Sequence, residues 1–262
     1  MSTVITDEYE LFCAGVTRLC GIDLAQYKRA QMERRIRSFA DRRGLTKLKE
    51  YLVLLGNDKD ELDAFLDRVT INISQLWRNP EQWDLLARKV LPEFAGRARL
   101  RAWSAGSSYG AEAYTLAGVC SDALPGVRAD ILGTDIDRRM VDRARAGIFS
   151  VDDARDVPRT QRLRWFAERD GELHADAKLK AACRFEVGDL LTMRPASRAY
   201  DLVLCRNTVI YFTLEVKDAL HARLAEALVP GGYFMVGSTE RISEPAQLGL
   251  EIAHPFVYRR VA

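Results

Sequence analysis

A turn rich in small residues in the first half of the chain has the residue types of a nucleotide-binding loop. Residues 101–114, RAWSAGSSYGAEAY, indicate a short buried strand, a tight turn containing Gly106 and Gly110, and the start of a helix. Small residues let a ligand approach the backbone closely, and unpaired N–H groups at a helix start favour an anion. The turn therefore predicts a site for a nucleotide-like cofactor. An ordinary strand-to-helix turn is the alternative, because Ser108 replaces the middle glycine of GxGxxG.

Two aspartates follow predicted strands and could contact such a cofactor. Asp135 ends the apolar run 131–134, and a carboxylate in this position can accept hydrogen bonds from both hydroxyls of a ribose. Asp137, two residues later, is more typical of a helix N-cap. Asp189 follows the predicted strand 184–187, where it could accept a hydrogen bond from an adenine amine or equally serve as a turn residue.

An arginine and a tyrosine stand in segments beside these elements. Arg78, within TINISQLWRNPEQW, could clamp a carboxylate through two parallel hydrogen bonds, or it could be an ordinary surface arginine. In that second case Trp77 and Trp83 of the same segment would pack between two domains, whereas in the first the segment could form a lid over the polar end of the cofactor. Tyr211 follows the predicted buried strand YDLVLC at its carboxyl end, where ligands collect in open α/β sheets, and a role in the core is the alternative.

The spacing of apolar residues divides the chain into a helical part and a mixed part. Helical spacing in the first part predicts helices over 9–19, 24–43, 48–55 and 61–69. From residue 100 the pattern alternates between strand and helix, which is typical of a mostly parallel sheet. A small hairpin is expected over 172–182 beside the main sheet. A final strand over 254–259 is expected to pair antiparallel with strand 233–236.

Positive charge is concentrated within residues 28–49. Nine lysines and arginines stand there against only Glu33 and Asp41. A solvated helix face would explain such a run, and a docking face for an acidic partner is the sharper interpretation. Nucleic acid is disfavoured as that partner, because no aromatic residues are interleaved for base stacking and the net charge of the chain is only +2.

Composition argues against several classes of protein and site. No apolar run approaches the ~20 residues that span a bilayer, and no signal peptide is evident, so neither membrane insertion nor secretion is expected. The five cysteines contain no CxxC pair and fit reduced thiols in the cytoplasm. The three histidines lie in unrelated segments, so neither a metal site nor a Ser-His-Asp triad is expected.

Taken together, several motifs in this order resemble the chemotaxis receptor glutamate methyltransferases, the CheR family. The motifs are MERRIRSFADRRG, TINISQLWR, WSAGSSYGAEAY, GTDID, GDLL, CRNTVIYF and GGYFMVGSTE. The resemblance implies an α/β fold in which a Rossmann-like class I methyltransferase domain with a mostly parallel sheet occupies 76–262. It also implies a small all-α receptor-docking domain over 1–75 and a small β-subdomain inserted around 155–187.

The resemblance further implies an activity and the residues that carry it. Members of the family transfer the methyl group of S-adenosyl-L-methionine to glutamate side chains of chemoreceptors and release S-adenosyl-L-homocysteine. The expected partners are the cytoplasmic helical domains of chemoreceptors, and the protein is expected to be a cytoplasmic monomer. Arg78 and Tyr211 are the expected catalytic residues, with Tyr211 near the transferred methyl group. The expected docking residues are Arg34, Arg35, Arg37 and Arg42. The expected cofactor contacts are Asn72, Ser74, Arg78, Gly106, Glu112, Asp135, Asp189, Leu190, Arg206 and Asn207.

The predicted cofactor turn departs from the family pattern. Where the family reads approximately STGEEPY, this chain has SYGAEAY, so Glu112 keeps the second acid while Ala111 and Ala113 replace the first acid and the proline. Tyr109 is the bulkiest change and could alter the shape of the turn or the affinity for cofactor. Asp189 stands where the family usually has asparagine, although a carboxylate can still accept from an amine.

Two other functions stay open because of these changes. A non-catalytic adaptor could keep the methyltransferase fold and bind only cofactor or receptor. A nicotinamide dehydrogenase would also use a glycine loop and an acid at a strand end. The incomplete fingerprint and the long step from Gly106 to Asp135 speak against the dehydrogenase.

Overall fold

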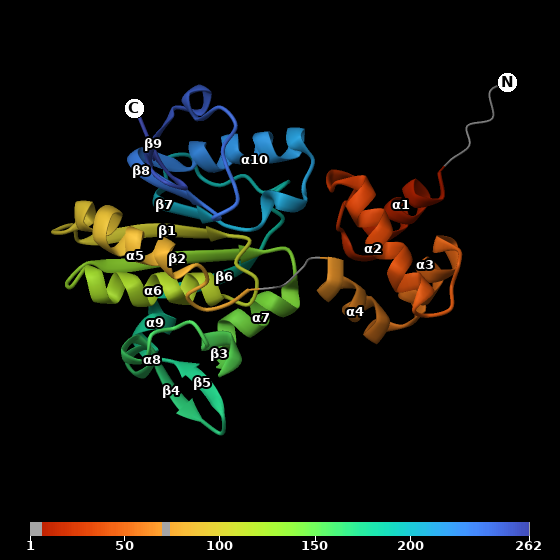
Figure 1. The fold of residues 1–262 in the computed structure, drawn as a ribbon, viewed down its shortest axis with the longest axis horizontal. Helices are drawn as coiled ribbons and strands as arrows, with labels where there is room; N and C mark the ends of the chain where they lie inside the picture. The colour runs from red at the N-terminus through yellow and green to blue at the C-terminus, as the bar shows by residue number, and fades with distance from the viewer. Residues whose placement is uncertain (1–6, 70–73, 262) are drawn as a thin grey trace. The chain divides into compact units, whose positions relative to one another are not determined.

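The computed structural model describes residues 7–69 and 74–261. These residues form two compact units (Figure 1). The smaller unit contains the described residues up to Val69 together with Tyr211–Val216, and the larger unit contains all the others. Within the described ranges, no helix is both long and apolar enough to cross a membrane.

The smaller unit consists of helices around an aromatic core. Its elements are α1 (Glu8–Cys20), the 3₁₀ turn η1 (Leu24–Gln26), α2 (Arg29–Asp41), α3 (Leu48–Asn57) and α4 (Lys59–Val69). The Asp7 carboxylate caps α1 by accepting from a backbone N–H at 2.9 Å, and Gly21 ends this helix in the left-handed conformation. The ring of Phe12 lies 6.1 Å from that of Tyr51 and 6.0 Å from that of Phe65. Helices α1, α3 and α4 therefore share one core, and the helices predicted over 9–19, 48–55 and 61–69 are confirmed.

The helix predicted over 24–43 is wrong in its first turn. The side chain of Asp23 accepts from the N–H two residues on, at 3.0 Å, and starts η1, after which Tyr27 takes an extended conformation. Tyr27 forms an isolated antiparallel bridge with Phe212, and the two rings meet at a centroid distance of 5.0 Å. Helix α2 therefore begins only at Arg29.

The larger unit is built on a seven-stranded sheet in the order β6-β2-β1-β7-β8-β10-β9. Its strands are β1 (Arg99–Ala105), β2 (Arg128–Asp135), β6 (Cys183–Val187), β7 (Tyr200–Cys205), β8 (Leu228–Val236), β9 (Leu250–His254) and β10 (Val257–Arg260). The first five strands in spatial order pair parallel, whereas β10 pairs antiparallel with β8 and β9. This is the mostly parallel sheet that the alternating pattern predicts.

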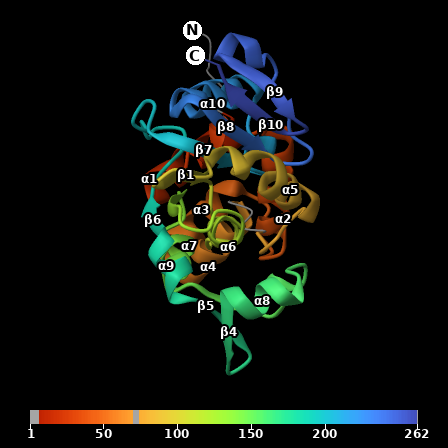
Figure 2. The ribbon, with the colours of Figure 1, turned by 90° about the vertical axis from the view of Figure 1, so that its left-hand side faces the viewer.

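Helices cover both faces of this sheet. Seen roughly along the strands in Figure 2, α5 (Pro80–Leu85) and α6 (Ala111–Ala123) lie on one side and α10 (Leu214–Glu226) lies on the other. The short helical segments η2 (Leu86–Val90) and η3 (Leu91–Phe94) continue from α5 and contact α6. Helix α7 (Arg138–Ala146) packs on β2 and β6. The main sheet is thus the middle layer of three, as in other doubly wound α/β folds.

A small antiparallel sheet is inserted between α7 and β6. It has the order β3-β5-β4, with strands β3 (Ile148–Ser150), β4 (Phe166–Arg169) and β5 (Glu172–Ala175), and it lies beside α8 (Arg159–Trp165) and α9 (Ala177–Ala182) (Figure 1). The hairpin predicted over 172–182 is wrong, because the chain turns at Asp170 and Gly171 and Asp176 then caps helix α9. The last residues of the expected insertion, 183–187, form β6 of the main sheet instead.

The strand predicted over 254–259 is also divided in two. Phe256 has a φ of +64° and breaks the strand, so that β9 and β10 form a hairpin with each other. Strand β10 pairs with β8 as expected, and β9 adds an outer edge that the pattern did not predict.

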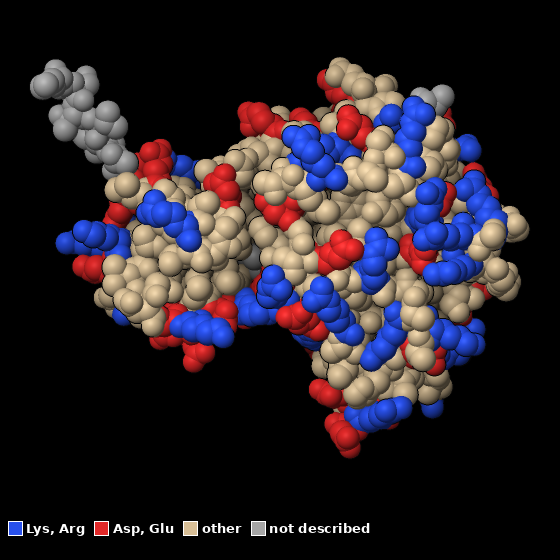
Figure 3. Space-filling model, turned by 180° about the vertical axis from the view of Figure 1, so that it is seen from behind, with Lys and Arg blue, Asp and Glu red and all other residues tan. Residues whose placement is uncertain are grey.

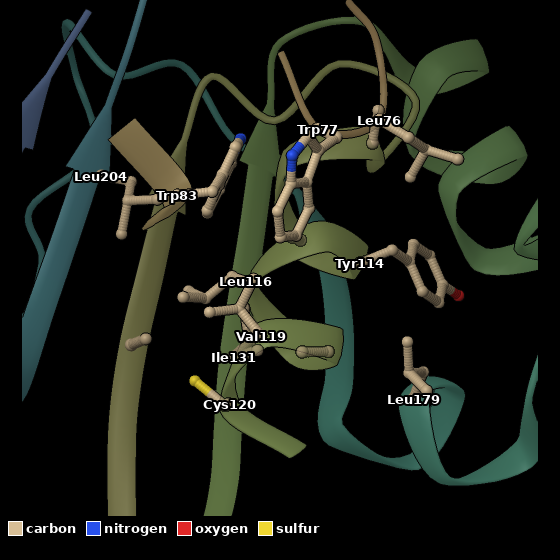
Figure 4. Packing of buried hydrophobic residues seen from close by; sticks show 14 of the residues in the cluster. Leu76, Trp77, Trp83, Tyr114, Leu116, Val119, Cys120, Ile131, Leu179 and Leu204 are labelled. Atoms are coloured by element: carbon tan, nitrogen blue, oxygen red, sulfur yellow. The ribbon is translucent and has the colours of Figure 1, made fainter. Parts of the chain in front are cut away.

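Trp77 and Trp83 pack inside the larger unit, which disagrees with the alternative in which they pack between two domains. Their rings stack at a centroid distance of 6.4 Å, and the Trp77 ring lies 5.4 Å from that of Trp165. Figure 4 shows both indoles in one cluster with Leu116 of α6. The polar segment that carries Arg78 is therefore anchored in the core of the larger unit.

Candidate functional site

The carboxyl ends of four neighbouring parallel strands form one edge of the larger unit. The register places Ala105 of β1 beside Thr134 of β2, and Asp135 of β2 beside Val187 of β6. Strand β7 pairs with the other side of β1. The turn after β1, Asp135, the turn after β6 and the residues after β7 therefore meet at the edge where parallel α/β sheets bind ligands.

The turn between β1 and α6 is held close to strand β2. The N–H groups of Gly106 and Ser107 both donate to the carbonyl of Thr134 at 2.9 Å. Gly106 has a φ of +79°, and a Cβ at this position would come within 2.6 Å of the Thr208 hydroxyl. The backbone path of the turn therefore requires a glycine at the position where the sequence predicts close approach of a ligand.

Asp135 is a buried carboxylate at this edge. Its Oδ2 accepts from the Ser108 N–H at 2.7 Å, and its Oδ1 accepts from the Asp137 N–H at 3.0 Å. Burial raises the pKa of Asp135 to about 6, because the charged form loses its hydration. The carboxylate retains acceptor capacity that a ribose hydroxyl could use. Asp137 has the N-cap role that its position predicts, because it accepts from the Arg139 N–H at 2.9 Å at the start of α7.

A buried ion pair joins α6 to the end of β7. Glu112 accepts from the Ser104 hydroxyl at 2.7 Å, and its other oxygen lies 3.4 Å from Nη1 of Arg206. The Arg206 side chain is only 2% exposed, and its Nη2 and Nε donate to Gln82 Oε1 at 2.8 and 3.1 Å. Burial raises the pKa of Glu112 and lowers that of Arg206, because the pair does not fully replace the hydration that both groups lose.

Arg206 also fixes the backbone at Arg78. Its Nη2 donates to the Arg78 carbonyl at 2.7 Å, and its guanidinium carbon lies 4.8 Å from the ring centroid of Trp83. Trp83 Nε1 donates to the same carbonyl at 2.9 Å. The structure thus brings Arg78 and Arg206 together, with the Arg206 guanidinium engaged by protein groups.

A buried acid that the sequence analysis did not single out holds the residue after Arg206. Asn207 has a φ of +59°, and its N–H donates to Glu240 Oε2 at 2.8 Å. The same oxygen accepts from the Gly237 N–H at 2.7 Å. A Cβ at Gly237 would come within 2.9 Å of the Asn207 backbone nitrogen. Glu240 and Gly237 therefore shape the bend that places Asn207 at this edge.

Asp189 closes the turn after β6. Its carboxylate accepts from the Leu191 N–H at 2.8 Å, which is the turn role that the sequence left open. The neighbouring Gly188 N–H donates to the Asp135 carbonyl at 2.9 Å, and Leu190 is buried. This turn therefore lies directly beside Asp135, and the Asp189 carboxylate retains lone pairs that can accept from an amine.

The polar groups at this edge include hydrogen-bonding atoms that a polar ligand could use. Asp135 and Asp189 offer acceptors for a ribose and an amine. Among the described residues, the buried Ser107 hydroxyl and the buried Oδ1 of Asn207 have no hydrogen-bond partner. Buried polar atoms without partners are uncommon in native proteins, and a bound polar ligand is one way to satisfy them.

Two expected site residues, Asn72 and Tyr211, are not part of the described larger unit. Asn72 lies outside the described residues. Its neighbour Ser74 does belong to the larger unit, where the Ser74 carbonyl accepts from the Tyr109 hydroxyl. Tyr211 belongs to the segment Tyr211–Val216 of the smaller unit, where its carbonyl accepts from the Lys28 N–H at 2.9 Å. The structure therefore does not bring Tyr211 into the same unit as the other site residues.

The expected docking arginines lie on or next to α2 and differ in their pairing. Arg37 lies 2.8 Å from Glu33 and 3.3 Å from Glu8, so part of its charge is neutralised within the smaller unit. The other three form no ion pair with any residue that the structure describes: Arg34, Arg35 and Arg42. Their charges are therefore available to a partner.

Charges of both signs border the basic helix. An open groove along α2 is lined by Ala30, Glu33, Arg34, Arg37, Ser38 and Asp41. Figure 3 shows that blue and red side chains are also interspersed over one face of the molecule as a whole. Such a mixed surface suits a protein partner with complementary charges better than a uniformly negative phosphate backbone.

Sequence reasoning missed Gln82 and Glu240, whose side chains fix Arg206 and Asn207. Both are polar residues that are almost fully buried, at 3% exposure each. Gln82 stands in a segment with a turn signal, and Glu240 stands in the closing motif of the resemblance without a role of its own. Only their burial, which the sequence does not contain, separates them from surface residues.

Comparisons with known proteins identify the family of the chain. Residues 72–253 match the family described as CheR methyltransferase, SAM binding domain, and residues 7–70 match CheR methyltransferase, all-alpha domain. A chemotaxis protein methyltransferase of Listeria monocytogenes is 36% identical over 253 residues, which cover 96% of this chain and 96% of that protein. Chemotaxis protein methyltransferase 1 of Vibrio cholerae is 30% identical over 92% of this chain and 91% of its own length. The chain therefore belongs to the CheR methyltransferase family, and its cofactor is S-adenosylmethionine.

Proposed function

We propose that the protein transfers the methyl group of S-adenosylmethionine to glutamate side chains of chemoreceptors in the cytoplasm. The products are glutamate methyl esters, which serve chemotactic adaptation, and S-adenosylhomocysteine. The observation that carries the proposal is the extent of the likeness. Relatives named chemotaxis protein methyltransferase match 96% of the chain, so the likeness includes the helical domain as well as the cofactor domain.

Methyl transfer to a carboxylate does not require an acid or base from the protein. A glutamate with an ordinary pKa of about 4.3 is already ionised at neutral pH, so no general base is required. Bound S-adenosylmethionine supplies a methyl group on a positively charged sulfur. Asp135, Asp189 and Leu190 would hold the cofactor, whose sulfur would leave with the electron pair of the broken bond as the methyl group passes to a carboxylate oxygen of the substrate. The protein must bring the two groups into line and exclude water, and such alignment is worth ~7–11 kcal/mol.

We assign roles to the site residues on this basis. Asp135 accepts from the ribose hydroxyls, and Asp189 with Leu190 binds the adenine. Arg78 anchors the carboxylate of the cofactor or steers the carboxylate of the substrate. Tyr211, whose place follows from the family motif, orients one oxygen of the substrate carboxylate.

Transfer of labelled methyl groups to purified receptor signalling domains tests the proposal. Binding of S-adenosylhomocysteine is measured in parallel by calorimetry. We expect label on receptor glutamates that mild base releases, as it does from an ester. Cofactor binding without transfer would favour the adaptor, and a wild-type protein that binds no cofactor would mean that the altered SYGAEAY turn has lost the site.

Reversing the unpaired charges on α2 is expected to weaken receptor methylation without affecting cofactor binding. In the variant Arg34→Glu/Arg35→Glu, two like-charge contacts replace attractive ones, so kcat/KM for the receptor should fall about tenfold at low salt. The fall should become smaller as salt screens the interaction. The measurement is the methylation rate at several receptor and salt concentrations.

The control is Lys59→Glu/Lys178→Glu, which changes the net charge equally. Both lysines are exposed in the first turns of α4 and α9, where glutamate is favourable for a helix. The control should keep the wild-type rate. Equal losses in both variants would show that net charge, rather than docking on α2, sets the rate.

A further inference from the structure

We propose that Tyr109 is a positioning residue of the cofactor site. Its hydroxyl holds the segment of Ser74 and Arg78 against the turn between β1 and α6. The inference rests on the proposed cofactor contacts of this segment and gives a role to a residue that the sequence identified only as a bulky departure from the family pattern.

The Tyr109 side chain is buried in the larger unit. It is 3% exposed, and its ring lies 6.2 Å from the ring of Phe149. The guanidinium carbon of Arg143 lies 3.9 Å from the Tyr109 ring centroid. The hydroxyl is within hydrogen-bonding distance of the Ser74 carbonyl, and it lies 2.8 Å from Asp153 Oδ1. The side chain therefore connects the turn to two other segments.

Asp153 is itself held firmly enough to serve as an anchor. Its Oδ2 accepts from Arg143 Nη2 at 2.7 Å and from the Ser150 N–H at 2.9 Å. Its carbonyl accepts from the Leu76 N–H at 3.0 Å. The segment before Arg78 is thus bound to Asp153 directly through Leu76, and the single proton of the Tyr109 hydroxyl is shared between the Ser74 carbonyl and Asp153.

Besides Tyr109, a hydrogen bond to α6 and one to the residue after β7 hold this segment. The Trp77 N–H donates to the Thr115 hydroxyl of α6 at 3.0 Å, and Arg206 holds the Arg78 carbonyl at 2.7 Å. Trp77 has a φ of +60°, a conformation that a bulky residue adopts only when its surroundings enforce it. Loss of the Tyr109 hydroxyl removes the contact at the start of the segment and lets Leu76 and Trp77 move away from the turn.

The test is Tyr109→Phe, which removes the hydroxyl and keeps the ring. We expect its affinity for S-adenosylhomocysteine to fall about fivefold in calorimetry, the effect of one hydrogen bond. In the protein without cofactor, exchange of the Leu76 amide hydrogen should become about tenfold faster, since this amide lies in the released segment. The matched control is Tyr114→Phe, because Tyr114 is 1% exposed, also packs against Phe149, and donates to the Ala144 carbonyl at 3.1 Å.

Tyr114→Phe should lower the thermal stability but leave cofactor affinity and Leu76 exchange at wild-type values. Equal effects of both variants on affinity would reduce the role of Tyr109 to general stability. Unchanged Leu76 exchange in Tyr109→Phe would overturn the positioning role, whether or not the wild-type protein binds the cofactor. Failure of the wild-type protein to bind would instead contradict the proposed function.

Discussion

Asp135→Asn is expected to weaken the binding of S-adenosylhomocysteine while making the ligand-free protein more stable. The variant loses one acceptor oxygen and the negative charge that strengthens hydrogen bonds from ribose hydroxyls. Two charge-assisted hydrogen bonds are weakened, so the dissociation constant at neutral pH should rise by about tenfold or more. Calorimetry with S-adenosylhomocysteine measures this change.

The gain in stability follows from the pKa of Asp135. Burial raises this pKa from 3.8 to about 6, so the folded protein binds the proton more tightly than the unfolded chain does. The free energy of unfolding therefore falls as pH rises from the pKa of the unfolded chain, 3.8, to the pKa of the folded protein, about 6. At neutral pH the buried charge lowers the free energy of unfolding by about 3 kcal/mol. Asparagine removes this cost but leaves one of the Ser108 and Asp137 N–H groups without an acceptor. The net gain in the free energy of unfolding should be about 1–2 kcal/mol.

The same pKa makes wild-type binding pH-dependent. As pH falls through about 6, Asp135 takes up a proton and loses acceptor capacity, so affinity for S-adenosylhomocysteine should fall. Asp135→Asn should lack this part of the pH dependence. The control is Asp137→Asn, which can still cap α7 but loses the ion pair with Arg139 at 2.9 Å, so it should cost about 1 kcal/mol of stability or less with little change in affinity. If Asp137→Asn weakened binding more than Asp135→Asn, the ribose would have been assigned to the wrong aspartate.

The order of elements in the fold could be predicted from the sequence because local patterns contain it. Short apolar runs that alternate with helical patterns predicted strands β1, β2, β7 and β8. Helical spacing of apolar residues predicted most of the smaller unit. The divided strand at Phe256 and the misplaced hairpin after Asp170 and Gly171 have local causes, whereas two other errors involve contacts between residues that are distant in sequence. The bridge between Tyr27 and Phe212 shortens α2, and the stacking of Trp77 on Trp83 and Trp165 draws the linking segment into the larger unit. No local pattern contains such partners.

The candidate site, too, could be predicted only in part from the sequence. Asp135, Asp189, Arg206 and Asn207 follow strands that end at one edge, so the rule for parallel sheets predicts that they meet. The residues that hold them could not be predicted in this way. Gln82 reaches Arg206 across 124 positions in the sequence. From the sequence alone, a polar residue in a predicted turn is expected to be exposed to solvent.

Arg206→Gln is expected to destabilise the protein strongly. The substitution removes the guanidinium from beside Glu112 and leaves a buried carboxylate without its counter-charge. Such a loss typically costs about 3–5 kcal/mol of the free energy of unfolding. The Arg78 carbonyl loses a donor as well, so affinity for S-adenosylhomocysteine should fall along with stability. Urea denaturation followed by circular dichroism measures the first effect, and calorimetry the second.

Two further variants separate charge from packing. Arg99→Gln removes an arginine that is paired with Asp130 at the other end of the sheet, and because its side chain is 53% exposed the loss should stay below about 1 kcal/mol. In Arg206→Gln/Glu112→Gln the unpaired charge is gone, so the double variant should be more stable than Arg206→Gln alone. The Arg78 carbonyl still lacks its donor there, so the double variant should bind cofactor no better than the single one. A double variant less stable than Arg206→Gln would show that Glu112 stabilises the fold mainly through Ser104, and recovery of full affinity would show that Arg206 does not act through Arg78.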